Sequence, residues 1–361
     1  MELALNHFVT LGQSGLRVSP LCLGTMTFGQ EWGWGSTVED SKAIIDAYLD
    51  KGGNFLDTAN IYTKGHSEAV IGDHFHERGD RDRVVIATKC TGNMFLGDPN
   101  GGGNGRKALM ASVDESLRRL KTDYIDLLWS HFWDQNTPIT EMLATFDDLV
   151  RSGKVRYVGL SDHPAWVCAM AQYECRANGW APLIGLQIEH SLIERSVEGE
   201  LMPMARALGM GVTPWSPLKY GILTGKYTRD NQPEKGDARA AGSEHLNERA
   251  FKIIDALLGV AAEVDAEPAQ VALRWVLDRP GVDSPIFGAR TMKQLESNVG
   301  ALGVTLTPEH TKALDGASAM KQSFPFDFVE GVKKVIQGGT KINGAQWDPW
   351  DMAPANSDER W

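Results

Sequence analysis

The sequence predicts an α/β fold, a (β/α)8 TIM barrel with an N-terminal β-hairpin and a C-terminal helix that leads into an irregular tail. Short β-branched or apolar runs alternate with helix-length segments along most of the chain, and eight such runs occur. This alternation is typical of βα units around a parallel sheet. The 361 residues fit one such barrel, which spans about 200 to more than 400 residues. We expect a single domain over residues 1–361, with its core at about 11–302 and a tail at 319–361.

The chain opens with a hairpin signal. Residues 8–18 contain two short runs around Gly12-Gln13-Ser14-Gly15, and such a hairpin could plug the bottom of a barrel. The tail beyond the last helix is expected to add no strand.

The eight predicted strands lie at residues 21–24, 54–57, 84–88, 125–130, 155–160, 184–188, 211–215 and 282–286. Predicted helices include residues 38–51, 107–120, 139–151, 164–178 and 308–316, and the tail holds Trp347, Trp350 and Trp361.

An open doubly wound sheet is the alternative arrangement of alternating strands and helices. Its dinucleotide-binding form needs the pattern GxGxxG between a strand and a helix, and this chain lacks that pattern. The glycine cluster GGGNGR at residues 101–106 follows no strand directly, and we interpret it as a mobile loop after the third strand. Eight strands with intervening helices therefore favour the closed barrel.

Composition narrows the possible partners and the compartment. The net charge is −11 without a Lys/Arg-rich run, so nucleic-acid binding has no source of counterion release. The four cysteines show no CxxC spacing, which favours reduced thiols. The first ten residues lack the regions of a signal peptide, and no apolar stretch approaches about 20 residues. We expect a cytoplasmic protein that binds neither nucleic acid nor membranes, and the oligomeric state stays open.

Four reactive side chains fall at or just beyond the ends of consecutive predicted strands, where a parallel barrel carries its functional groups. Asp57 ends the second strand and Tyr62 follows five residues later, whereas Lys89 and His131 come at the ends of the third and fourth strands. Taken singly, His131 has an equally good explanation as a structural histidine, and Asp57 or Lys89 is better explained as part of an ordinary ion pair at the rim of the barrel. Their joint placement favours a reactive cluster at one end of the barrel.

The chemistry of this cluster suits reduction of a carbonyl group. A phenol with a pKa of about 10 needs a lowering of about 2 to 3 units to exchange protons near neutrality. An ammonium group at about 4 Å supplies about 4 kcal/mol at an effective dielectric constant of 20, but about 1 kcal/mol in water. We expect Lys89 to lower the pKa of Tyr62 where water is excluded, and Asp57 to orient Lys89. His131 would donate a hydrogen bond to the oxygen on which negative charge develops.

Three segments resemble the aldo-keto reductase superfamily, in the branch that includes bacterial aldo/keto reductases and potassium-channel β-subunits. They are GNFLDTANIY at residues 53–62, IATK at 86–89 and YIDL at 124–127, which leads to His131. The resemblance covers about residues 11–302. It implies NADPH as the hydride donor, a small aldehyde or ketone as substrate, and a catalytic tetrad of Asp57, Tyr62, Lys89 and His131 with Tyr62 as the general acid.

The same resemblance implies three groups of residues that bind NADPH. Many members carry Asn at the position of Asp162. Lys226 lies in GILTGKY, which lacks the spacing of a phosphate-binding P-loop. The first group follows the first, second, fifth, sixth and seventh strands and comprises Thr25, Met26, Gln30, Asp57, Ser161, Asp162, Gln187 and Trp215. The second group, near the pyrophosphate, is Ser216, Leu218 and Lys226, and the third, near the adenosine, is Gly288, Arg290, Gln294 and Asn298.

The segment after the eighth strand supports NADPH on its own chemistry. Residues 291–294 have the spacing of a capping box at a helix start, and helix N-termini receive phosphate groups. Gly288 permits close backbone approach, and Arg290 can pair with a 2′-phosphate, which favours NADPH over NADH.

Two other functions remain as alternatives. An NADPH-binding sensor or regulatory subunit with little turnover would also use the cofactor segments, but the channel-associated branch departs from histidine at the position of His131. A metal-dependent hydrolase needs clustered His and carboxylate ligands at strand ends, and only His131 qualifies, so no metal site is predicted. Trp32, Trp34 and Trp133 are expected to surround the reactive end and to line a substrate pocket.

Overall fold

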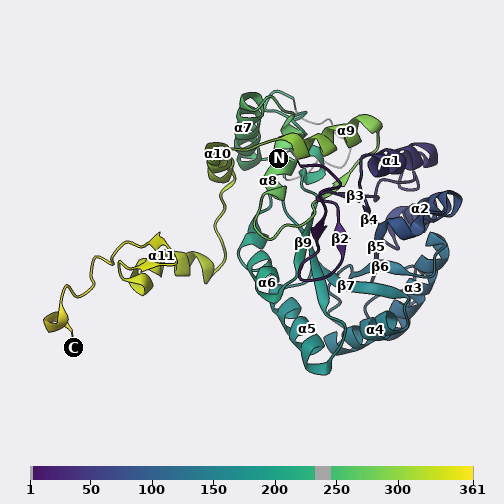
Figure 1. Ribbon diagram of the computed structural model, residues 1–361, viewed down its shortest axis with the longest axis horizontal. Coiled ribbons are helices and arrows are strands. Elements are labelled where there is room, and N and C mark those ends of the chain that lie inside the picture. The colour runs from purple at the N-terminus through teal and green to yellow at the C-terminus, as the bar shows by residue number, and fades with distance from the viewer. Residues whose placement is uncertain (1–2, 232–244, 361) are drawn as a thin grey trace. The chain divides into compact units, whose positions relative to one another are not determined.

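The computed structural model describes residues 3–231 and 245–360 and divides into two compact units, Met1–Ser318 and Ala319–Trp361 (Figure 1). The first unit confirms the predicted barrel. Eight parallel strands follow the order β10-β3-β4-β5-β6-β7-β8-β9. They are β3 (Cys22–Gly24), β4 (Phe55–Asp57), β5 (Val85–Cys90), β6 (Ile125–Ser130), β7 (Val155–Ser161), β8 (Leu183–Glu189), β9 (Gly211–Trp215) and β10 (Ile286–Gly288).

The eighth strand differs from its prediction at residues 282–286, because β10 starts only at Ile286. Residues 282–285 make a different connection. Val282 forms an isolated parallel bridge with Val212 of β9, and the Asp283 N–H donates to the Val212 carbonyl at 2.9 Å. The next residues form β10, which pairs in parallel with β3. The predicted segment therefore connects β9 to β3 and nearly closes the barrel. The strand is interrupted at Pro285, which has no N–H to donate to a neighbouring strand.

Helices cover the outside of the barrel (Figure 1). Thr37 caps α1 by accepting a hydrogen bond from the Asp40 N–H at 3.1 Å. The predicted helices are confirmed to within two residues at each end. The helices of this unit are α1 (Val38–Asp50), α2 (His66–Arg78), α3 (Arg106–Leu120), α4 (Ile139–Arg151), α5 (Ala165–Asn178), α6 (Leu201–Leu208), α7 (Glu248–Glu263), α8 (Pro268–Leu277), α9 (Met292–Gly300) and α10 (Pro308–Ser318).

The predicted hairpin forms and closes the N-terminal end of the barrel. Strands β1 (Val9–Thr10) and β2 (Arg17–Val18) pair antiparallel, and their buried Leu11 and Val18 join the same apolar cluster as the inward side chains of the barrel. The Gly12 N–H donates to Asp283 Oδ2 at 2.8 Å. A Cβ atom at Gly12 would lie 2.5 Å from the Gly211 nitrogen. Only glycine lets the hairpin approach the strand ends this closely.

One of the largest side chains in the barrel interior is Trp129, and two glycines make room for it. Trp129 of β6 is fully buried. A Cβ atom at Gly159 would lie 2.4 Å from its ring, and one at Gly185 would lie 2.8 Å from it. Neighbouring strands β7 and β8 thus leave out side chains where β6 supplies an indole, so the interior is a packed core and not a pore.

The second unit has more regular structure than the irregular tail that we expected. Helix α11 (Phe326–Gln337) carries apolar residues at helical spacing, at Phe328, Val332 and Val335. The strands β11 (Lys341–Ile342) and β12 (Ala345–Gln346) pair antiparallel around Asn343-Gly344, both at positive φ. An Asn-Gly pair is a strong hairpin signal, so this hairpin could have been predicted from the sequence. In the described residues of both units, no helix is long and apolar enough to cross a membrane.

Candidate active site

Lys89 lies at the centre of the predicted cluster. Its ammonium group pairs with Asp57 Oδ1, donates to the Thr58 carbonyl at 2.8 Å and donates to the Tyr62 hydroxyl at 3.1 Å. The Lys89 and Asp57 side chains are 1% and 3% exposed. Burial lowers the pKa of Lys89, but Asp57 and Tyr62 more than offset this, so the pKa lies above its ordinary value. The structure therefore places a charged amine against a phenol in a site that excludes most water.

Tyr62 sits on an unusual turn. It opens the 3-10 segment Tyr62–Gly65, in which Thr63, Lys64 and Gly65 all have positive φ. The two non-glycine residues cost about 1 to 2 kcal/mol each in this conformation. Side-chain bonds hold the turn, because the Thr63 hydroxyl donates to the Phe28 carbonyl at 2.8 Å and accepts from the Ser67 N–H at 2.9 Å. The chain thus uses stabilising contacts to direct the phenol toward Lys89.

His131 follows β6 directly and lies beside Tyr62. The ring centroids of His131 and Tyr62 are 6.0 Å apart in an edge-on arrangement, and the Phe132 ring stacks on His131 with a centroid distance of 4.0 Å. Burial, with the charge of Lys89 as the second cause, lowers the pKa of His131 to about 2. The imidazole is therefore neutral near pH 7 and can donate one N–H. Its Nδ1 atom is buried without a hydrogen-bond partner among the described residues.

The expected lowering of the Tyr62 pKa does not occur in this structure. Burial raises the pKa of Tyr62 above its ordinary value, and the opposing effect of Lys89 does not offset it. Exclusion of water strengthens the attraction of Lys89 for a phenolate, but it also removes the hydration of that phenolate. The phenol is consequently protonated near neutrality, which suits the donation of a proton.

Several residues predicted to bind a nicotinamide lie next to this cluster. The Gln187 side-chain amide donates to Asp57 Oδ2 at 2.9 Å, so it contacts the tetrad itself. The Trp215 Nε1–H donates to Asp162 Oδ1 at 3.0 Å, and the buried Ser161 hydroxyl lies 3.3 Å from Asp162 Oδ2. Although Asp162 as a whole is exposed, the protein around its carboxylate raises its pKa to about 6.

The residues after β3 divide into buried and accessible ones. Thr25 is fully buried, and its hydroxyl lies 2.9 Å from the Ser67 hydroxyl and 3.1 Å from the Asp57 carbonyl. Met26 is partly exposed and Gln30 is exposed. Thr25 therefore supports the strand ends from inside, whereas the side chains of Met26 and Gln30 are accessible to a ligand.

The segment after β9 forms a tight turn at the same end of the barrel. Ser216 has a φ of +53°, and its hydroxyl accepts a hydrogen bond from the Tyr220 N–H at 3.2 Å. Leu218 is partly buried, and Lys226 is exposed with its ammonium group 4.6 Å from the Tyr227 ring. A Cβ atom at Gly221 would lie 3.6 Å from Lys226 Nζ. The amine of Lys226 thus lies over a backbone position that carries no side chain.

The segment after β10 leads into the N-terminus of α9. Thr291 caps this helix by accepting from the Gln294 N–H at 3.3 Å. The reciprocal bond differs from a capping box, because the Gln294 side chain accepts from the Arg290 N–H at 2.8 Å. The Asn298 side chain donates to the Gly288 carbonyl at 3.2 Å. Gly288 and Arg290 are exposed, and a Cβ atom at Gly288 would meet nothing within 4 Å. This segment is open to a ligand.

Aromatic side chains surround the reactive end, though not all as expected. Trp32 lies 6.4 Å from Tyr62 and 5.6 Å from Trp34, measured between ring centroids. Trp133 packs edge-on against Trp166 of α5 at 5.7 Å.

Sequence reasoning missed Phe132, whose signal was its place next to His131. It also missed the buried Lys219, which pairs with Glu189 at 2.6 Å.

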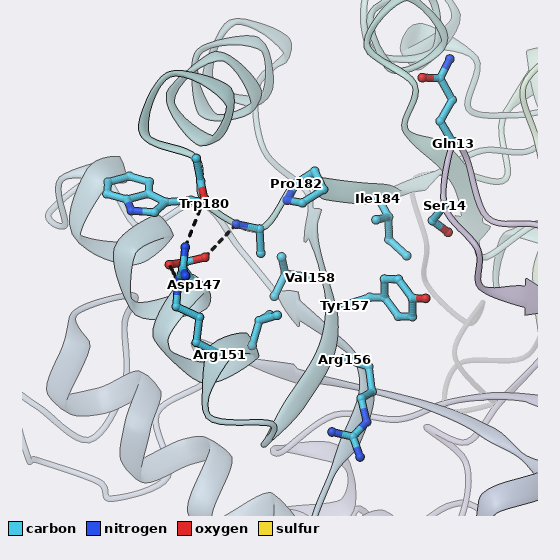
Figure 2. Close-up of a pocket in the computed structure, with 13 residues that line it drawn as sticks. Gln13, Ser14, Asp147, Arg151, Arg156, Tyr157, Val158, Trp180, Pro182 and Ile184 are labelled. Atoms are coloured by element: carbon cyan, nitrogen blue, oxygen red, sulfur yellow. Dashed lines mark hydrogen bonds and ion pairs between the residues drawn. The ribbon is translucent and has the colours of Figure 1, made fainter.

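A hollow of about 450 Å³ lies at the opposite, N-terminal end of the strands (Figure 2). Gln13 and Ser14 of the hairpin line it together with Arg156 of β7 and Ile184 of β8. None of the predicted site residues contributes to it. The candidate active site is therefore the buried cluster at the C-terminal end of the barrel.

No group of three His, Cys, Asp or Glu side chains in the described parts of the chain is arranged to hold a metal ion.

Comparison with known proteins gives the family of this chain. The model of the aldo/keto reductase family matches residues 20–319. A norsolorinic acid reductase of Aspergillus flavus is 34% identical over 332 residues, which cover 90% of this chain and 84% of that protein. An aryl-alcohol dehydrogenase of Pestalotiopsis microspora is 35% identical over 93% of this chain and 88% of its own length. An uncharacterized oxidoreductase of Bacillus subtilis, YrpG, is 38% identical over 86% of this chain and 95% of its own length. The chain belongs to the aldo/keto reductase family.

Proposed function

We propose that this protein is an NADPH-dependent reductase that converts an aldehyde or ketone to an alcohol, with Tyr62 as the general acid. One observation carries the proposal. The Tyr62 hydroxyl lies 3.1 Å from the buried ammonium group of Lys89, which pairs with Asp57, and the neutral His131 lies beside the same ring. Membership of the aldo/keto reductase family and relatives named as reductases support carbonyl reduction.

The four residues of the tetrad have different roles in the reduction of the carbonyl group. When bound, NADPH would supply a hydride to the carbonyl carbon. As the π electrons move onto oxygen, the Tyr62 hydroxyl transfers its proton to that oxygen, and the product is an alcohol. The phenolate left on Tyr62 is stabilised by the Lys89 ammonium, which Asp57 holds in place. His131 donates a second hydrogen bond to the same oxygen.

The accessible residues fit the charged parts of NADPH. The exposed Arg290 immediately precedes the capped start of α9, where backbone N–H groups favour a phosphate. Gly288 leaves space for close approach of a ligand to the backbone. At the other end, Trp215 and Asp162 hold each other next to the tetrad, where an aromatic face and a polar group suit a nicotinamide. We propose Met26, Gln30, Ser216, Leu218 and Lys226 as the contacts between them.

We propose an aromatic carbonyl compound as the substrate class. Trp32 and Phe132 lie against Tyr62 and His131, so a planar ring can stack beside the reacting oxygen. One of the relatives is named for an aromatic substrate, the aryl-alcohol dehydrogenase of Pestalotiopsis microspora. The cytoplasm is the proposed location, in keeping with four buried cysteines that form no disulfide.

The first test is reduction of 4-nitrobenzaldehyde with NADPH, followed as loss of cofactor absorbance. The wild-type protein is expected to turn over. Tyr62→Phe removes only the proton donor, so its rate should fall by about 10² to 10⁴-fold while NADPH still quenches tryptophan fluorescence as in the wild type. Full activity in this variant would refute the assigned acid. Cofactor binding without turnover in the wild type would instead favour the sensor.

The second test concerns the choice of cofactor. Arg290→Ala should weaken NADPH binding by about 10-fold or more and leave NADH binding nearly unchanged, because only NADPH carries the 2′-phosphate. Dissociation constants for both cofactors decide this. Lys293→Ala, in the first turn of α9, is the matched control for general loss of positive charge. An unchanged ratio of the two affinities in Arg290→Ala would remove the argument for the phosphate.

A further inference from the structure

A buried ion pair lies behind the turn that carries Tyr62. Glu68 of α2 is fully buried, and its Oε2 atom lies 2.9 Å from Nε of Arg119, near the end of α3. The Arg119 side chain is only 9% exposed. Burial raises the pKa of Glu68, and the charge of Arg119 is the main opposing influence. Each charge therefore depends on the other to remain inside the protein.

Arg119 packs directly against the turn Tyr62–Gly65, whose last three residues have positive φ. A Cβ atom at Gly65, the last residue of the Tyr62–Gly65 segment, would lie 2.2 Å from Arg119 Nη1. The guanidinium thus packs on the backbone of this turn, three residues from Tyr62. On its other side, Thr63 is held by the Phe28 carbonyl and the Ser67 N–H. The turn is clamped between these two sets of contacts.

The same pair reaches the strand of Lys89 and the loop that follows it. Thr88, immediately before Lys89, donates its hydroxyl to Glu68 Oε1 at 2.5 Å. Arg119 Nη2 lies 3.4 Å from the sulfur of Met94, in the loop between β5 and α3. One ion pair therefore contacts the Tyr62 turn and the β5 segment that carries Lys89.

We infer that Glu68 and Arg119 are positioning residues that fix the Tyr62 hydroxyl against Lys89, and thereby set the rate of proton donation. This inference rests on the proposed function, because it concerns the same proton. Neither residue touches the reacting atoms; both act through the Tyr62 turn and β5. An error of about 1 Å in the position of a catalytic group can lower a rate by about 100-fold.

The chain offers a matched control at the other end of the barrel. Arg81 and Asp126 form a second partly buried pair at 2.7 Å, with side chains 13% and 15% exposed. Arg81 also donates to the Val84 and Tyr124 carbonyls, at the starts of β5 and β6. Arg81→Met therefore removes a comparable ion pair that has no contact with the Tyr62 turn.

The experiment compares Arg119→Met, Arg119→Lys, the double variant Glu68→Gln/Arg119→Met and Arg81→Met. Turnover of 4-nitrobenzaldehyde at saturating NADPH, its solvent deuterium isotope effect, NADPH affinity and Tm are measured for each. For Arg119→Met we expect kcat to fall about 10 to 100-fold, with a larger solvent isotope effect because proton transfer limits the rate. NADPH affinity should stay within about twofold, and Arg119→Lys should recover part of kcat because it keeps the charge without the planar fork.

The double variant separates positioning from stability. It leaves no buried charge without a partner, so Tm should recover, but kcat should stay low because no guanidinium packs on Gly65. Recovery of kcat together with Tm would show a merely structural role and overturn the inference. So would equal kcat values in Arg119→Met and Arg81→Met in an active wild-type background. A wild-type protein that binds NADPH without reducing aldehydes would overturn the proposed function, and this inference with it.

Discussion

The two ends of the barrel use the same kind of interaction for different purposes. At the N-terminal end, Arg81 and Asp126 pair at 2.7 Å, and their remaining bonds go to backbone groups of neighbouring strands. At the C-terminal end, Lys89 pairs with Asp57 and directs a further N–H to the Tyr62 hydroxyl. One pair joins strands, whereas the other holds a side chain that can give up a proton.

Backbone conformation differs between the two ends in the same way. At the N-terminal end, positive φ values near the barrel belong mostly to glycines such as Gly12 and Gly209, which adopt them without strain, and Lys121 at the end of α3 is an exception. At the C-terminal end, Thr63, Lys64, Asp162 and Ser216 have positive φ. Backbone strain of this kind often marks functional sites. The comparison teaches that the reactive groups, and most of the non-glycine residues with positive φ near the barrel, lie together at the C-terminal end.

The largest effect is expected from Lys89→Met. This change leaves the buried Asp57 without its cation and removes the donor to Tyr62, so kcat should fall by about 10² to 10⁴-fold. The free energy of unfolding should also drop by about 3 to 5 kcal/mol. Steady-state kinetics and urea unfolding measure the two effects. Turnover within tenfold of the wild type would break the proposed division between the two ends.

A change in the barrel interior should affect stability without affecting chemistry. In Gly159→Ala the new Cβ atom would lie 2.4 Å from the Trp129 ring, so the free energy of unfolding should fall by about 1 to 3 kcal/mol. The kcat of the folded fraction should stay unchanged. Gly259→Ala in α7 is the matched control, because its Cβ atom would meet nothing and should add up to about 1 kcal/mol of stability. A large loss of kcat in Gly159→Ala would contradict the separation.

The smallest effect is expected from Asp283→Asn at the N-terminal end. Burial raises the pKa of Asp283 to about 6, although the Gly12 N–H opposes this. Because the folded pKa exceeds the unfolded value of about 3.9, the folded state binds more protons, and this residue's contribution to stability is lost as pH rises from about 4 to 6. Asn keeps an oxygen for Gly12, so the variant should be more stable than the wild type by about 1 to 2 kcal/mol at pH 7 and by nearly nothing at pH 4.

Unfolding in urea at both pH values tests this sign. A variant that is destabilised equally at pH 4 and pH 7 would show that the carboxylate contributes mainly through its hydrogen bond. Turnover with NADPH should not change, because Asp283 lies beside Gly211 at the start of β9.

Much of the candidate site was predictable because a parallel barrel turns chain order into position. Asp57, Lys89 and His131 follow consecutive strand ends, so their side chains had to meet at one end of the barrel. Phe132 and the Asn343-Gly344 hairpin carried local signals that sequence reasoning did not use. Glu68 and Arg119 had no such signal, because a charged residue on a helix is expected to face water.

The sequence by itself determined the barrel and the positions of Asp57, Tyr62, Lys89 and His131, because local periodicity and strand order suffice for both. Only the tertiary structure decided that burial raises the pKa of Tyr62, that Gln187 bonds to Asp57, and that Arg119 packs on Gly65. It also decided that Val282 bridges β9 before β10 begins. These properties depend on exclusion of water and on distances between residues far apart in the chain, and neither quantity is contained in local sequence.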